Sequence, residues 1–153
     1  MSMQNAMVSG LVGAGVLTAI HESARQVIQD APRMEILAKR AVTYSLEAAD
    51  QPVPPNRYLH PMTLVGDIAA NTAYYSLIGL ARPENGVAVG AALGLAAGIG
   101  GVLLPGPMGL GTEPSARTPQ TAAMTVAWYT LGGLAAGLVY SLMSNGKSGG
   151  DSE

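Results

Sequence analysis

The residues best suited to chemistry in this chain gather on one predicted helix face around Asp67. Asp67 is the only acidic residue in the apolar stretch 62–81, and Asn71 and Tyr74 follow it at helical spacing. Residues three and four positions apart in a helix share a face. Acidic side chains within a membrane are costly and commonly mark functional sites. The sequence therefore predicts a polar stripe inside the membrane, formed by Asp67, Asn71, Tyr74 and the adjacent Tyr75.

Two roles for Asp67 follow from its depth in the expected helix. It lies about 7 Å from the start of that helix, at about 1.5 Å per residue, so it can reach groups near the membrane surface. We expect a structural pair with His21 or Arg25, at the end of the preceding apolar stretch. The alternative is a pathway for ions or protons along the stripe. A water-filled cavity at Asp67 would favour transport, whereas pairing at a helix end would favour a structural role.

No other group of residues predicts catalysis. His21 and Glu22 belong to the sequence HESAR, which lacks the second histidine of the HExxH zinc-protease motif. His21 and His60 flank one loop and would make three metal ligands with Glu22 or Asp67, but isolated histidines are more often structural. The chain contains no cysteine, which excludes thiolate chemistry. We therefore expect a protein that is not an enzyme and holds no metal or cofactor.

The distribution of charge predicts the elements that must position these residues. Charged residues are only 12% of the chain, and they are absent from 1–21, 85–112 and 118–146. About 20 apolar residues are enough for a helix to cross a membrane. A soluble bundle with an alanine-rich core is the alternative, but the last two stretches lack a polar face. We predict an all-α integral membrane four-helix bundle with spans at residues 3–20, 62–81, 86–104 and 120–143.

The segment between the first two spans carries most of the charge. Asp30 and Pro32 are typical of a helix start, and Met34, Leu37 and Ala41 then share a face. We predict a cytoplasmic amphipathic helix over 31–50, resting equally well on lipid or on protein. The proline-rich strip 51–61 is predicted to be extended, and 145–153 is predicted to be a flexible tail after a single membrane domain, 1–144.

The basic residues predict the orientation of the chain. Six of the eight lie in the loops 21–61 and 105–119, namely Arg25, Arg33, Lys39, Arg40, Arg57 and Arg117. Loops rich in lysine and arginine stay in the cytoplasm. We expect a multi-pass protein of a bacterial-type inner or plasma membrane, with both termini outside.

Regular glycine spacing predicts close helix packing. Glycine recurs every fourth residue in the third span and again in the fourth, at Gly86, Gly90, Gly94, Gly98, Gly133 and Gly137. Small residues at this spacing form a groove into which another helix backbone fits. We favour a neighbouring helix of the same chain over another protomer as the occupant.

These observations favour a non-enzymatic membrane component that packs against itself or against a larger membrane complex, in contact with lipid. The alternative is a small oligomeric transporter or channel that uses Asp67, Asn71 and Tyr74. A net charge of −2 gives no basic excess, so we expect no nucleic-acid partner.

Overall fold

The computed structural model describes residues 3–145, and within this range it contains helices and loops but no strand. Its long helices are α1 (Met3–Val27), α2 (Met34–Ala48), α3 (Asn56–Tyr75), α4 (Gly86–Leu103) and α6 (Pro119–Asn145). Short helical turns, η1 (Ser76–Leu80) and η2 (Pro83–Asn85), connect α3 to α4, and α5 (Glu113–Ala116) precedes α6. The predicted all-α fold is confirmed.

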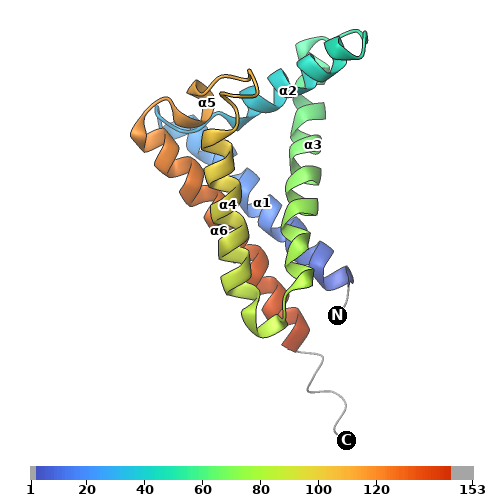
Figure 1. The fold of residues 1–153 in the computed structure, drawn as a ribbon, viewed down its shortest axis with the longest axis vertical. Helices are drawn as coiled ribbons and strands as arrows, with labels where there is room; N and C mark the ends of the chain where they lie inside the picture. The colour runs from blue at the N-terminus through green and yellow to red at the C-terminus, as the bar shows by residue number, and fades with distance from the viewer. Residues whose placement is uncertain (1–2, 146–153) are drawn as a thin grey trace, which may run out of the picture.

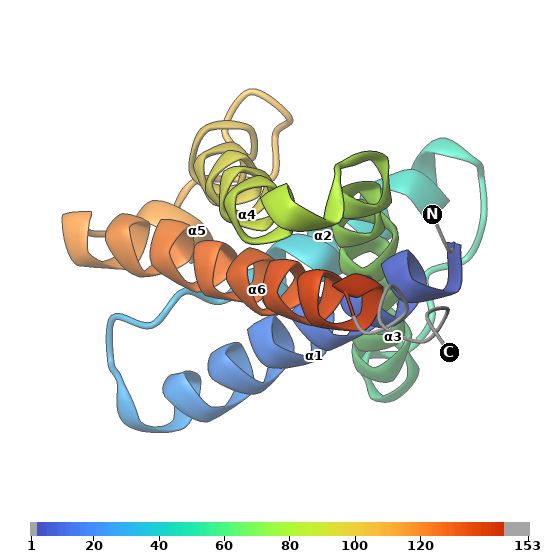
Figure 2. The same ribbon diagram turned by 90° about the horizontal axis from the view of Figure 1, so that it is seen from below.

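The helices are arranged around α6. It lies between α4 and α1 in Figure 2, and its contacts with these two helices are the most extensive in the fold. Helix α3 packs against α1 but makes little contact with α4, so α3 and α4 stand apart in Figure 1. One end of this arrangement is crossed by α2, which packs on α3.

Three helices are long and apolar enough to cross a membrane: Met3–Val27, Pro83–Leu103 and Pro119–Ser144. The prediction of four spans is therefore supported for three of them. The predicted second span differs because α3 begins at Asn56, well before residue 62, and takes in Arg57 and His60. Its α-helical part also ends early, at Tyr75, and the chain continues through the tighter turns of η1.

Several predicted boundaries are corrected. Asp30 does not cap α2, because its backbone oxygen accepts a hydrogen bond from Thr121 and its carboxylate pairs with Arg117 at 3.0 Å. The helix begins at Met34 instead. The strip predicted to be extended over 51–61 stops at residue 55, and Pro61 lies inside α3, where it removes one backbone hydrogen bond. Of the predicted tail, only Asn145, the end of α6, lies within the described residues.

The four evenly spaced glycines of α4 face α6, and all four are buried. A Cβ atom added at Gly98 would lie 2.6 Å from Val126 Cα, and one at Gly94 would lie 2.7 Å from Thr130 Cα. On α6, Gly133 and Gly137 face α4 in turn, and an added Cβ at Gly137 would lie 2.8 Å from Val87 Cα. Real Cβ atoms essentially never come so close to their neighbours. The two helix backbones therefore touch directly.

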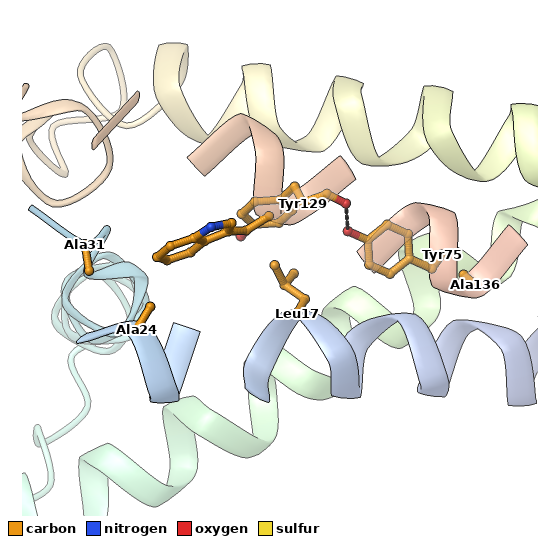
Figure 3. Close-up of a cluster of buried hydrophobic side chains, with 7 residues drawn as sticks. Leu17, Ala24, Ala31, Tyr75, Tyr129 and Ala136 are labelled. Atoms are coloured by element: carbon orange, nitrogen blue, oxygen red, sulfur yellow. Dashed lines mark hydrogen bonds between the residues drawn. The ribbon is translucent and has the colours of Figure 1, made fainter. Parts of the chain in front are cut away.

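Glycine also brings α1 against both of its neighbours. A Cβ atom at Gly13 would lie 2.7 Å from the backbone oxygen of Gly132 on α6, and one at Gly10 would lie 2.9 Å from the backbone nitrogen of Ser76. Tyr75 then fills the space between α1 and α6, with 0% of its surface exposed. Its hydroxyl donates a 2.7 Å hydrogen bond to the backbone oxygen of Tyr129, as Figure 3 shows beside Leu17. This bond anchors the end of α3.

The tight α4–α6 contact predicts opposite responses to alanine at two glycines of the same helix. Gly94→Ala should lower the free energy of unfolding by about 1–3 kcal/mol, because the new methyl group forces the backbones apart. Gly100→Ala is the matched control, since its Cβ would meet only Leu104 Cδ1 at an ordinary 3.5 Å, and should be neutral or stabilising by up to about 1 kcal/mol. Thermal unfolding in one detergent followed by circular dichroism compares them. Equal midpoints for the two variants would contradict the backbone contact.

Candidate functional site

A small cavity between α1, α2 and α3 brings together five titratable side chains. We call it the polar chamber; its volume is about 30 Å³. Since a water molecule needs about 10–15 Å³, it has room for roughly two. Its polar lining residues are Thr18, His21, Glu22, Glu35, His60, Thr63 and Asp67.

Three buried polar atoms on the polar chamber have no hydrogen-bond partner among the described residues: Thr18 Oγ1, His21 Nε2 and His60 Nδ1. Buried polar atoms nearly always have a partner, either protein or water. The other two such atoms, on Thr72 and Ser115, lie away from this cavity. Three of the five buried polar atoms without a partner in the described residues therefore belong to residues that line the polar chamber.

The imidazole of His21 is held in place by α6. Its ring meets Trp128 edge to face at 5.1 Å between centroids, and Tyr129 at 5.8 Å. Both aromatic residues are buried. The core thus fixes His21 at the boundary between the aromatic cluster and the polar chamber.

Asp67 and Arg25 do not meet. Arg25 forms an ion pair with Glu22 at 2.5 Å, one turn away on α1. The Asp67 carboxylate accepts a 3.1 Å hydrogen bond from Asn71 Nδ2 within α3, and no ion pair within residues 3–145 includes Asp67. His21 and Asp67 line the same polar chamber, so the structure brings them to one site without an ion pair between them.

A second, larger hollow runs between α3 and α4 and ends against α2. We call it the α3–α4 groove; its volume is about 520 Å³. Three residues of the predicted polar stripe line it, Asp67, Asn71 and Tyr74, among small residues such as Ala70, Ala96, Ala97, Gly100 and Gly101. The Tyr74 hydroxyl donates a 2.9 Å hydrogen bond to Leu93 O on α4. Tyr75, the fourth residue, instead points into the core.

Asp67 lies where the two hollows meet, since it lines both of them. It is therefore an acidic side chain with access to a polar cavity on one side and to a mostly small, apolar groove on the other. Such a group can exchange a proton or attract a cation. Among the described residues, no set of three histidine, cysteine or acidic side chains is placed to hold a metal ion.

Sequence reasoning considered His60 with Asp67 only as part of a metal site, and it missed Thr18 and Glu35 as neighbours of Asp67. The signal for His60 was present, because 60, 63 and 67 share a helical spacing with the stripe. The expectation that the helix starts at residue 62 obscured this spacing. Glu35 comes from α2, and only the packing of α2 on α3 brings it to the polar chamber.

Comparison with known protein families, with curated proteins and with solved structures finds no match for this chain.

Proposed function

We propose that the chain is a multi-pass membrane protein in which α1, α3, α4 and α6 all cross the bilayer. The observation that supports four spans is the apolar outer surface of every one of these helices. Large exposed apolar side chains occur on each, including Leu11, Val65, Leu95, Leu131 and Leu138. A soluble domain would not leave so much apolar surface in water, whereas lipid tails would cover it.

We further propose that both large loops lie in the cytoplasm. The elements that they contain, α2 and α5, lie at one end of the bundle, and the start of α1 and the end of α6 lie toward the other (Figure 1). Six of the eight basic residues belong to these two loops, and basic loops remain in the cytoplasm.

The function we propose is that of a non-enzymatic component of a membrane assembly, in which the α3–α4 groove receives a transmembrane helix of another protein. The single observation that carries this proposal is Asp67, an acidic side chain in the groove with no ion pair among the described residues. Intramembrane charges pair with one another, and small residues allow helices to approach closely. The partner helix would therefore carry a basic side chain.

A second copy of this chain fits the groove less well than a different protein. The stretches 1–21, 85–112 and 118–146, which include all of α4 and all of α6, contain no lysine or arginine. Arg25, at the end of α1, is already paired with Glu22. Arg57 lies in the first turn of α3, next to the loop. Among the described residues of α1, α4 and α6, no unpaired lysine or arginine is therefore available to reach Asp67 from a second copy.

A small oligomeric transporter or channel is the second candidate. It is favoured by the position of Asp67, Asn71 and Tyr74, which line the α3–α4 groove and, through Asp67, adjoin the polar chamber. A path of this kind would need further walls, because α3 and α4 stand apart along the groove.

The proposed orientation predicts which loops are accessible from outside the cell. Because the chain lacks cysteine, single cysteines can be placed at Ser45 on α2 and at Asn85 in η2, both exposed. In intact cells, a membrane-impermeant maleimide should label Asn85→Cys and leave Ser45→Cys unlabelled until the membrane is permeabilised. The reverse labelling pattern would invert the topology, and labelling of neither would contradict the spans.

The proposed assembly predicts selective binding of a basic transmembrane helix. The probes are two dye-labelled leucine–alanine transmembrane peptides, identical except for one central lysine or leucine, in vesicles that also hold the full chain with a second dye at Asn85→Cys, an exposed position outside the groove. The lysine peptide should give the stronger energy transfer, and Asp67→Asn should weaken its binding about tenfold, close to 1.4 kcal/mol. The leucine peptide, which lacks the charge, is the control for non-specific contact.

Two results would contradict this assembly. One is equal binding of both peptides, and the other is binding that Asp67→Asn leaves unchanged. Ion flux through liposomes that contain the chain alone, if Asp67→Asn abolishes it without altering the unfolding midpoint, would instead establish the transporter.

A further inference from the structure

The polar chamber carries more unsatisfied hydrogen-bonding capacity than any other part of residues 3–145. Thr18 Oγ1, His21 Nε2 and His60 Nδ1 are all buried and without a protein partner, and they line a single cavity of about 30 Å³. A buried polar atom that lacks a partner costs about 1–3 kcal/mol. Water bridges are the usual way to satisfy a roomy polar site, and this volume suits roughly two molecules.

The charges around the polar chamber make it a site for protons. From α1, His21 and Glu22 line it, with Glu22 paired to Arg25; from α2, Glu35 lines it. From α3, His60 and Asp67 line it, and Asn71 bonds the Asp67 carboxylate.

Away from the polar chamber, Asp67 faces the α3–α4 groove. The titratable groups there are the phenols of Tyr74 and Tyr129, and α4 adds none. Within the described part of the chain, no lysine or arginine lines the polar chamber, and Arg25 is paired with the lining residue Glu22, so acidic side chains outnumber basic ones on its wall and attract protons.

The two sides of Asp67 differ in their access to water. Small and apolar side chains dominate the α3–α4 groove, and within a membrane such a groove is covered by lipid or by another helix. His60 lies in the second turn of α3, directly after the loop that joins α2 to α3. A proton from the aqueous phase therefore has a polar route to Asp67 through the polar chamber, with His60 at its loop side.

We propose that the polar chamber holds water and passes protons between the loop-side solution and Asp67. In the inward direction, hydronium gives a proton to the His60 imidazole, and the imidazolium releases it to a water hydrogen-bonded in the polar chamber. That water passes a proton to the Asp67 carboxylate, which becomes a neutral carboxylic acid hydrogen-bonded to Asn71. In the outward direction the same groups return the proton to solvent, so no net charge is created. This step concerns the chain without a partner helix, because a basic side chain in the α3–α4 groove would pair with the Asp67 carboxylate and keep it ionised.

The test follows protonation of Asp67 directly, in the full chain reconstituted in lipid nanodiscs. After a rapid pH drop, time-resolved infrared spectroscopy records the carboxylic acid band that Asp67→Asn removes. Thr18→Val and Thr72→Val form a matched pair, because each removes a buried, unpartnered hydroxyl but only Thr18 lines the polar chamber. His60→Leu removes the proposed entry group.

We expect His60→Leu to slow the appearance of the band at least about tenfold, as for the loss of a general acid–base group. Thr18→Val should slow it by a smaller factor, and Thr72→Val should leave the rate unchanged. An unchanged rate in both His60→Leu and Thr18→Val would overturn the proposal, as would a band that never responds to pH. Because Thr18→Val preserves shape, it keeps the test valid if His60→Leu fails to fold.

Discussion

Direct backbone contact along both sides of α6 is the interaction on which the rest of this structure depends. In lipid, burial of apolar side chains gives little drive for association, so helices gain from close van der Waals packing instead. Gly133 and Gly137 meet the glycine row of α4, while Gly132 meets Gly13 on α1. Gly132 and Gly133, which are adjacent in sequence, thus contact different neighbouring helices. Any side chain at these contacts would separate the backbones and loosen the three-helix layer formed by α4, α6 and α1.

The position of α3 follows from this layer. It is attached on one side only, where Gly10 of α1 receives the Ser76 turn and where Tyr75 reaches across to Tyr129. On its other side, the Tyr74 hydroxyl provides a hydrogen bond to Leu93 O on α4, but the helices remain apart. This one-sided attachment creates the α3–α4 groove, and the crossing of α2 closes the polar chamber above it. Asp67 owes its position between the two hollows to the same asymmetry.

The parts of this arrangement that could be predicted from sequence are those that depend only on the spacing of residues along one helix. A glycine every fourth residue defines a helix face without reference to any partner, and the run from Asp67 to Tyr74 does the same for the polar stripe. The contact of Gly13 with Gly132 could not be predicted, because it depends on which helices become neighbours. The start of α3 was misjudged because proline was treated as a barrier, although Pro61 is accommodated inside the helix. That error put His60 in a loop rather than on the Asp67 face of α3, whereas Glu35 could be assigned only from the packing of α2 on α3.

The most direct test of the central claim is solid-state NMR of the unmodified chain in lipid bilayers, with ¹³C at the α-carbon of every glycine. Backbone contact predicts cross-peaks between glycines of different helices, namely Gly94 with Gly133, Gly90 with Gly137, and Gly13 with Gly132. These signals need no substitution and cannot arise from helices separated by side chains. Their presence would establish that α6 makes backbone contact with both α4 and α1. Their absence, in a sample that retains cross-peaks between glycines within α4, would contradict the account.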